Sequence, residues 1–304
     1  MTSEKEKIIQ LLKKYNLSPN FTYGQNFLTD ESVLEEMVEV AGVNKKDTVL
    51  EIGPGIGNLT RMLCEKAGYV LSVEKDPKFF PILRSVKKDY KENFRFEVAD
   101  ILEFNFSKEI QTRSQSTDKN PNLHISANSE SIRKVGPVNY KVVANIPYYI
   151  TGKILQLFLT APNRPDSITV LTQKEVAENV VAEVGDLGVL GISVQLFGKP
   201  RVVKIVSKKS FFPSPKVDSA VLHIELFKKP IYKIADQRKF FKVVKACFAG
   251  KRKQLHNTLV NNLRLEKSEA LKILEELKIS PSVRPQELSI ESWVKLVDKI
   301  SVLI

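Results

Sequence analysis

The sequence predicts an α/β fold: a parallel β-sheet covered by helices on both faces, followed by a small, all-helical C-terminal domain. Short apolar runs alternate with segments of helical spacing, which requires parallel strands with helices on both faces of the sheet. A glycine-rich turn follows the first apolar run, and only helical patterns occur after residue 230. A chain of 304 residues suits one large domain and one smaller one.

The elements of the sheet follow from local patterns. Residues 31–41 have helical spacing, begin after a capping Thr29 or Asp30 and end at Gly42. Runs rich in β-branched and apolar residues predict strands at 48–52, 69–73, 94–98, 140–144 and 167–171. The segments between and after them predict helices at 59–66, 77–88, 153–159 and 174–183. Two later β-rich runs, 201–206 and 220–227, are expected to form an antiparallel pair.

Two segments depart from this alternation. Residues 107–136 are rich in Ser, Asn, Gln and Pro, which predicts a poorly ordered surface insertion between two strands. The sequence Lys228-Lys229-Pro230 separates the sheet region from the helical one. We therefore expect a domain of residues 1–230 and a helical domain of residues 231–304. Helices in the second are predicted at 236–249, 252–263, 267–277 and 290–300.

Composition indicates where the protein works. Cys64 and Cys247 are far apart and give neither a metal-ligand spacing nor a disulfide framework, so we expect buried thiols, no metal and a reducing compartment. Residues 1–14 mix charges of both signs and do not resemble a signal peptide. No stretch approaches the roughly 20 apolar residues of a membrane span. We expect a soluble, cytoplasmic protein without a membrane partner.

Positive charge is concentrated in one region. The chain has a net charge of +12, but residues 199–264 contain 17 Lys and Arg against 3 Asp and Glu, a net of +14. The rest of the chain therefore carries 12 minus 14, or −2. Aromatic residues are interleaved with these charges, among them Phe211, Phe212, Phe240, Phe241 and Phe248. A concentrated cationic surface attracts phosphates and releases counterions, which predicts a nucleic-acid partner; a merely solubilising face is the alternative.

A nucleoside cofactor is predicted by the turn Glu51-Ile52-Gly53-Pro54-Gly55-Ile56-Gly57. Gly53, Gly55 and Gly57 fit a turn that brings backbone N–H groups close to a ligand. Glu74 ends the next strand, where its carboxylate can accept both ribose hydroxyls, and Asp100 ends the third, where it can accept an adenine amino hydrogen. The spacing G-x-G-x-G favours a nucleoside smaller than a dinucleotide, such as S-adenosylmethionine.

Methyl transfer to an exocyclic amine is predicted by Asn145-Ile146-Pro147-Tyr148. The adenine N6 lone pair is delocalised into the ring, so acceptors for both N–H groups favour an attacking geometry. The Asn145 side-chain oxygen and the Ile146 carbonyl are suitable acceptors, Pro147 stiffens the turn and Tyr148 offers a stacking face. Because a base must leave its stack to react, Phe211 and Phe212 are candidates for an opposite wall, with core packing as their alternative.

These motifs, in this order, resemble the KsgA family of small-subunit (16S) rRNA adenine N6,N6-dimethyltransferases. The matching segments cover nearly the whole chain: 24–30, 51–57, 73–76, 98–101, 145–150, 173–177, 212–219, 248–255 and 284–289. The resemblance implies a Rossmann-like class I methyltransferase sheet. It also implies dimethylation of two adjacent adenosines in a hairpin loop near the 3′ end of the RNA, within an assembling 30S particle, by a monomer with a role in ribosome biogenesis.

The resemblance also assigns residues. It implies cofactor binding by Asn26, Leu28, Gly53, Glu74, Asp100 and Asn145. We expect their neighbours in the same motifs to bind the cofactor as well: Gln25, Gly55, Gly57, Lys75 and Ile101. It implies stacking of the target base by Tyr148 and Phe212 beside the turn of Asn145, Ile146 and Pro147. Two features depart from the family: the insertion at 107–136 is long, and the run 250–253 is less rich in arginine than usual, which weakens the assignment of individual phosphate contacts there.

Two other functions fit parts of the pattern. A large-subunit rRNA adenine methyltransferase of the macrolide-resistance type shares both turns, but residues 217–219 and the long helical C-terminal region favour the small-subunit substrate. A ribosome-assembly factor that binds RNA without catalysis would share the fold and the charge. Intact Glu74 and Asn145–Tyr148 argue against a purely binding role.

Overall fold

The computed structural model describes residues 3–20, 23–106 and 139–303. The predicted insertion at 107–136 lies outside the described residues. The chain forms two compact units: residues 1–174 with 203–226, and residues 175–202 with 227–304. The predicted boundary at residue 230 lies close to the start of the second segment of the helical unit, but residues 175–202, which we expected in the first domain, belong to that unit. The division into a catalytic and a helical domain stays a prediction.

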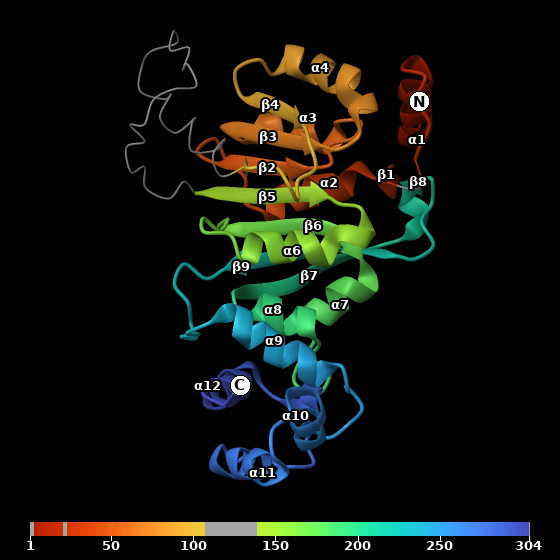
Figure 1. The fold of residues 1–304 in the computed structure, drawn as a ribbon. Helices are drawn as coiled ribbons and strands as arrows, with labels where there is room; N and C mark the ends of the chain where they lie inside the picture. The colour runs from red at the N-terminus through yellow and green to blue at the C-terminus, as the bar shows by residue number, and fades with distance from the viewer. Residues whose placement is uncertain (1–2, 21–22, 107–138, 304) are drawn as a thin grey trace, which may run out of the picture. The chain divides into compact units, whose positions relative to one another are not determined.

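Seven strands form one sheet in the order β4-β3-β2-β5-β6-β9-β7 (Figure 1), and all of it belongs to the first unit except residues 198–202 of β7. Its strands are β2 (Thr48–Ile52), β3 (Tyr69–Glu74), β4 (Phe94–Val98), β5 (Tyr140–Asn145), β6 (Ser167–Gln173), β7 (Gly198–Val206) and β9 (Ser219–Leu226). The first five pair in parallel, as predicted. β9 is antiparallel to β6 and lies between β6 and β7, so the two later β-rich runs are neighbours in the sheet.

The order of the strands fixes where a ligand can bind. From β2 the chain proceeds outward through β3 and β4, then returns to β5 on the other side of β2 and proceeds through β6. β2 and β5 are therefore neighbours whose following loops leave in opposite directions. In an open α/β sheet, ligands bind at such a switch point, beyond the carboxyl ends of the strands. The glycine-rich turn follows β2 and the Asn145 turn follows β5.

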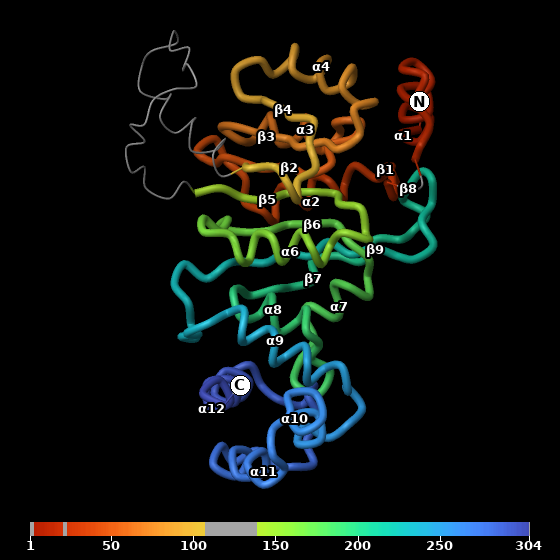
Figure 2. Tube along the Cα trace, in the orientation of Figure 1, coloured from red at the N-terminus to blue at the C-terminus, as the bar shows by residue number. Residues whose placement is uncertain are grey.

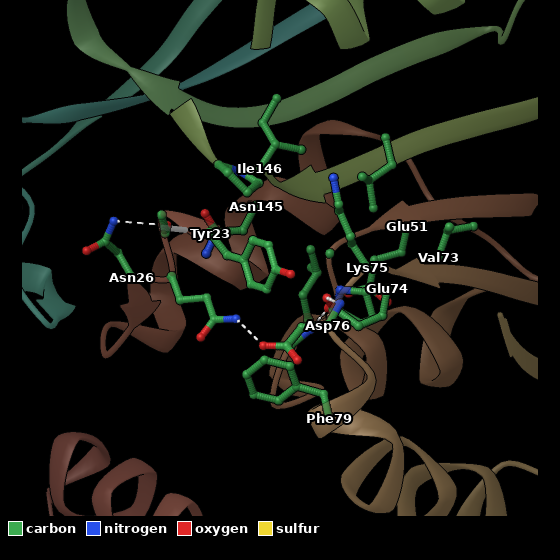
Figure 3. Close-up of a pocket in the computed structure, with 18 of the residues that line it drawn as sticks. Tyr23, Asn26, Glu51, Val73, Glu74, Lys75, Asp76, Phe79, Asn145 and Ile146 are labelled. Atoms are coloured by element: carbon green, nitrogen blue, oxygen red, sulfur yellow. Dashed lines mark hydrogen bonds between the residues drawn. The ribbon is translucent and has the colours of Figure 1, made fainter. Parts of the chain in front are cut away.

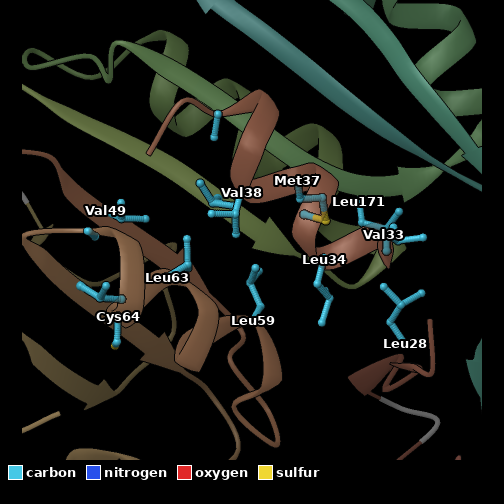
Figure 4. Packing of buried hydrophobic residues seen from close by; sticks show 14 of the residues in the cluster. Leu28, Val33, Leu34, Met37, Val38, Val49, Leu59, Leu63, Cys64 and Leu171 are labelled. Atoms are coloured by element: carbon cyan, nitrogen blue, oxygen red, sulfur yellow. The ribbon is translucent and has the colours of Figure 1, made fainter. Parts of the chain in front are cut away.

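Helices cover both faces of the sheet. The helices that precede or connect the strands of the sheet in this unit are α2 (Glu31–Val40), α3 (Asn58–Lys66), α4 (Phe80–Asp89) and α6 (Thr151–Leu159). α2 begins as predicted, because the Asp30 side chain accepts a hydrogen bond from the Ser32 backbone N–H. Apolar residues of α2 and α3, such as Met37 and Leu63, pack in one cluster with Val49 and Leu171 of the strands (Figure 4).

The opposite face is covered by α6. Phe158 of α6 contacts Phe106, which also contacts Tyr140 of β5. Tyr140 and Val143 are an odd number of residues apart, so their side chains point to opposite faces of β5. Since Val143 belongs to the cluster under α2 and α3, the sheet is buried on both sides, as the continuous apolar runs of β3 and β6 predict.

The N-terminal segment adds elements that were not predicted. Helix α1 (Glu4–Lys14) begins with a capping box between Ser3 and Glu6. β1 (Phe27–Leu28) and β8 (Phe211–Phe212) then form a separate two-stranded antiparallel sheet. Figure 2 shows these two segments, far apart in sequence, side by side. Ile8 and Leu12 of α1 pack in one cluster with Phe27, which fixes the segment that leads into β1.

The second unit is mainly helical. Its helices are α7 (Lys174–Val181), α8 (Val189–Gln195), α9 (Gln237–Phe248), α10 (Leu255–Leu263), α11 (Lys267–Glu276) and α12 (Ile290–Ile300). All four predicted C-terminal helices are present, although α10 begins three residues later than expected; α8 was not predicted. The buried Trp293 of α12 contacts Phe248 of α9, which joins the first and last helices of the C-terminal segment.

Candidate functional site

A pocket lies at the switch point of the sheet, within the first unit (Figure 3). It is lined by residues from the N-terminal segment 23–28, the turn after β2, the end of β3, the residues after β4, and the turn after β5. Nearly every predicted site residue is among them. Gly57 and Phe212 are the two exceptions.

The glycine turn has the backbone conformation that only glycine adopts easily. Gly53, Gly55 and Gly57 have φ angles of 65°, 54° and 80°, in the left-handed region that side chains disfavour. Gly57 does not line the pocket; it is the N-cap of α3, and a Cβ there would lie 3.0 Å from Val86. Its role is to start the helix and allow close packing, so the structure gives no support for direct cofactor contact by Gly57.

Glu74 is fixed in place by the glycine turn. Its side chain is buried, and its two oxygens accept hydrogen bonds from the backbone N–H of Gly55 at 3.0 Å and of Asp76 at 2.8 Å. Burial raises the pKa of this carboxyl, while the backbone donors act in the opposite direction. Each carboxylate oxygen has a second lone pair. Glu74 can therefore still accept two hydroxyl donors, which fits the ribose of a nucleoside.

Asp100 is held by two partners at the edge of the pocket. Its Oδ2 forms an ion pair with Lys75 Nζ at 2.8 Å, and its Oδ1 accepts a hydrogen bond from the Leu102 backbone N–H at 3.0 Å. The hydrogen bond from Lys75, followed by that from Leu102, lowers the pKa of Asp100. Ile101, directly after it, is buried and contributes an apolar wall. A charged acceptor beside an apolar surface suits an adenine ring.

The N-terminal segment closes another side of the pocket. Gln25 Nε2 donates to Asp76 Oδ2 at 2.9 Å, which ties this segment to the loop after β3. The Asn26 side chain donates to the Gly24 carbonyl at 3.2 Å, and Leu28 is buried. All three predicted residues line the pocket, as Figure 3 shows for the labelled Asn26. Gln25 already has partners, so its part is to connect the segment to Asp76.

The Asn145 turn meets the glycine turn directly. Asn145 is the last residue of β5, and a Cβ on Gly53 would lie 3.9 Å from its carbonyl oxygen. The Asn145 carboxamide has no hydrogen-bond partner in the described part of the chain. Ile146 is buried, Pro147 has an extended backbone, and Tyr148 begins a 3-10 helix. The predicted acceptors and stacking face therefore border the same pocket as the glycine turn.

Phe212 and Phe211 have different environments. Phe211 is buried in the core cluster, so its alternative interpretation, core packing, is correct. Phe212 is half-buried, pairs with Phe27 in the β1–β8 sheet and packs against the cluster that contains α1. It does not line the pocket, although its partner Phe27 does. Its role as the opposite wall for a base stays a prediction.

Sequence reasoning missed several residues that line the pocket: Tyr23, Glu51, Asp76, Phe79 and Tyr149. Glu51 is buried, and its Oε2 accepts hydrogen bonds from Thr60 at 2.8 Å and Ser72 at 2.5 Å. Its Oε1 has no partner among the described residues. Burial raises the pKa of Glu51 to about 7. The sequence did offer one sign that Glu51 is special: it is a charged residue within the apolar strand 48–52.

The basic region keeps its charges on the surface but not its aromatic rings. Most Lys and Arg side chains of residues 199–264 are exposed. Phe240 is buried, and Phe241 packs against it at an interplanar angle of 88°. Phe211 and Phe240 thus belong to the core, while Phe212, Phe241 and Phe248 are half-buried, so the exposed charge is the main support for a nucleic-acid surface. None of the helices in the described ranges combines the length and apolar character of a membrane span.

Both the sequence and the fold are similar to those of known proteins. A family model described as ribosomal RNA adenine dimethylase matches residues 16–301. A protein named ribosomal RNA small subunit methyltransferase A from Clostridium botulinum is 38% identical over 293 residues, covering 96% of this chain and 97% of its own. One of the same name from Dehalococcoides mccartyi is 37% identical, covering 94% of this chain and 90% of its own.

Two solved structures share the fold. A dimethyladenosine transferase from Plasmodium falciparum has a TM-score of 0.70 at 23% identity and covers 91% of this chain and 98% of its own. The 23S rRNA methyltransferase ErmE has a TM-score of 0.64 at 24% identity and covers 91% of this chain and 100% of its own. At these identities the likeness concerns the fold alone. The predicted Rossmann-like class I methyltransferase sheet with a helical C-terminal region is confirmed.

Proposed function

Because the chain belongs to the ribosomal RNA adenine dimethylase family, we propose that it transfers methyl groups from S-adenosylmethionine to adenine N6 in small-subunit rRNA. The proposed target is two adjacent adenosines in a hairpin loop near the 3′ end, each receiving two methyl groups. The proposed setting is an assembling 30S particle in the cytoplasm, where the protein acts as a monomer. Relatives that are 37% and 38% identical carry the small-subunit name, which favours this RNA over the large-subunit one.

One observation carries the proposal: the cofactor turn and the Asn145 turn border one pocket. The close approach of Gly53 to Asn145 lets a nucleoside held by Glu74 lie beside the Asn145 carboxamide. The buried Glu74 carboxylate, fixed by two backbone N–H groups, fits the ribose hydroxyls. Asp100 and Ile101 fit the adenine ring. These residues suit S-adenosylmethionine, which supplies an activated methyl group on a sulfonium centre.

The residues after β5 would position the acceptor. The Asn145 side-chain oxygen and the Ile146 carbonyl would each accept one N–H of the target amine, which directs the nitrogen lone pair away from both acceptors. Tyr148 would stack on the extruded base and replace part of the lost base stacking. Positioning and charge complementarity supply the catalysis in this account, and no strong general base is required.

Two measurements test the proposal: the identity of the methylated nucleoside, and the RNA in which it is formed. Purified protein is incubated with methyl-labelled S-adenosylmethionine and, separately, small-subunit particles, naked 16S rRNA and large-subunit particles. The RNA is then digested to nucleosides, and the sites are mapped by primer extension. We expect N6,N6-dimethyladenosine at two adjacent positions of the small-subunit RNA. Label in the large-subunit RNA alone would overturn the choice of substrate, and the comparison of particles with naked RNA tests the proposed setting.

A further inference from the structure

The Tyr148 side chain is anchored at its hydroxyl. Tyr148 Oη and Ser219 Oγ lie 2.6 Å apart, and Ser219, the first residue of β9, is fully buried. Tyr148 itself is half-buried and lines the pocket. The aromatic ring is therefore held at both ends, by its backbone in the Asn145 turn and by a buried hydroxyl on another strand.

A second hydroxyl pair supports the same turn. Thr151, which begins α6, is hydrogen-bonded through its Oγ1 to Thr172 of β6 at 3.0 Å, and both side chains are buried. In the pairing of β6 with β9, Thr172 lies opposite Ala220 and Gln173 opposite Ser219. The two anchoring hydroxyls thus occupy neighbouring positions of one strand pair. They fasten residues 148 and 151, which are one short helical turn apart.

The anchor matters because of the conformation that it selects. A tyrosine side chain rotates about χ1 and χ2, and residues 148–150 form only a single 3-10 turn. A hydrogen bond at the far end of the ring restricts both angles. Burial raises the pKa of Tyr148, so the phenol keeps its proton at neutral pH. A rigid ring offers a base a preformed stacking face, with less ordering required when the base enters.

We propose that Ser219 is a positioning residue for methyl transfer, which fixes the Tyr148 ring in the orientation that stacks on the target base. The inference rests on the proposed function, because it requires Tyr148 to contact the base. Ser219 itself touches neither the base nor the cofactor in this account. It acts through the 2.6 Å contact with the Tyr148 hydroxyl.

The test compares four variants with the wild-type protein: Ser219→Ala, Ser219→Thr, Tyr148→Phe and the double variant Ser219→Ala with Tyr148→Phe. Steady-state kcat and KM are measured with small-subunit particles, and cofactor Kd by calorimetry. We expect Ser219→Ala to lower kcat/KM for RNA about tenfold, the scale of one lost hydrogen bond, with cofactor Kd within about twofold. Tyr148→Phe should lower kcat/KM for RNA by the same factor. The double variant should lower it no further than either single variant does. Ser219→Thr, which keeps the hydroxyl, should restore most of the activity.

The matched control is Thr169→Val. Thr169 Oγ1 is hydrogen-bonded to His223 Nδ1 at 2.8 Å across the same pair of strands, and Thr169 is also fully buried. Loss of the Thr169 hydroxyl should leave kcat/KM for RNA within about twofold of wild type. Melting temperatures of Thr169→Val and Ser219→Ala report any general destabilisation. An equal loss in Thr169→Val, or single-variant losses that multiply in the double variant, would overturn the proposal.

Failure of this inference is distinct from failure of the proposed function. If the wild-type protein forms N6,N6-dimethyladenosine but Ser219→Ala is as active, Ser219 does not position Tyr148. If the wild-type protein forms no N6-modified adenosine, the proposed function fails, and the positioning role fails with it. Unchanged activity in Tyr148→Phe would also contradict the anchor, because the hydroxyl would then have no effect on transfer.

Discussion

The Glu74 carboxylate accepts a hydrogen bond from the backbone N–H of Gly55 at 3.0 Å. This contact joins the acidic end of β3 to the glycine turn that follows β2. The sequence predicted separate roles for the two motifs: Glu74 binds the ribose, and the glycine turn lets the cofactor approach the backbone. The structure shows that the acid also holds the turn, so the two motifs act as one rigid part of the pocket.

Replacement of Glu74 by Gln should therefore weaken cofactor binding strongly. An amide has only one accepting oxygen, so its NH2 group would face a backbone N–H or a ribose hydroxyl donor. Losing hydrogen bonds to a charged acceptor corresponds to a decrease in affinity of about 10- to 100-fold. Calorimetric titration with S-adenosylmethionine measures this change. Glu103→Gln, at an exposed position outside the pocket, should bind like wild type; unchanged affinity in Glu74→Gln would exclude Glu74 as the ribose acceptor.

Stability should depend on pH through Glu51. Burial raises its pKa from 4.5 to about 7 in the folded protein. As the pH rises from about 4.5 to about 7, the unfolded chain releases this proton while the folded protein retains it. The free energy of unfolding contributed by Glu51 therefore decreases over this range, by on the order of 3 kcal/mol at most. Glu51→Gln lacks the titration and should gain stability relative to wild type as the pH rises.

Urea denaturation at pH 5 and pH 8 measures this difference for wild type and Glu51→Gln. The hydroxyls of Ser72 and Thr60, which donate to Glu51, can also accept hydrogen bonds from the Gln amide, so the variant can keep its partners. The exposed Glu103→Gln variant serves as the control for the removal of one carboxylate charge. If Glu51→Gln differs from wild type by the same free energy of unfolding at both pH values, the Glu51 carboxyl does not titrate between them.

Phosphate contacts should come from the segment that carries β8. Lys208, Lys209 and Lys216 are exposed there, and Asp218 of the same segment accepts a hydrogen bond from the Lys208 backbone N–H at 2.9 Å. This segment leads directly into Ser219, the anchor of Tyr148. Replacing the three lysines by Ala should weaken RNA binding and reduce the slope of log K against log salt by about 2, at roughly 0.7 for each contact with single-stranded RNA.

The control for that experiment removes the same charge elsewhere. Lys46, Lys88 and Lys91 are also exposed, and none of them lines the cofactor pocket. Their triple Ala variant should keep the salt slope of wild type. Equal slopes for both triple variants would show that net charge, and not this segment, determines RNA affinity.

The fold was predictable where the local pattern and the tertiary structure agree. The apolar run at 48–52 and the alternating run at 94–98 form strands with those same bounds. The first is buried within the sheet, where continuous apolar sequence is expected, and the second is an edge strand with Arg95 and Val98 exposed. Helix α1 was missed because it is rich in charged residues, and its buried residues, Ile8 and Leu12, gain their partners only when Phe27 packs against them. Contacts between residues far apart in the sequence cannot be recognised from the local pattern of apolar residues.

The site was predictable where its residues lie at the ends of predicted strands. Gly53, Glu74 and Asn145 are recognisable because each ends a predicted strand or follows one, and parallel strands bring their carboxyl ends together. Gly57 fits the motif equally well, yet it caps α3 outside the pocket. Ser219 was recognisable only as part of the matching segment 212–219, and its contact with Tyr148 could not be predicted, because that contact depends on the pairing of β6 with β9.

Replacement of Asn145 by Ala tests the central claim most directly, since the carboxamide beside the cofactor turn is proposed to hold the target amine. Single-turnover methyl transfer to small-subunit particles is measured with saturating labelled S-adenosylmethionine, followed by nucleoside analysis and by RNA binding of the same variant. The account predicts that Asn145→Ala forms no detectable N6-methylated adenosine while its RNA affinity stays within about threefold of wild type, because phosphate contacts dominate binding. Formation of N6,N6-dimethyladenosine by this variant at the wild-type rate would contradict it.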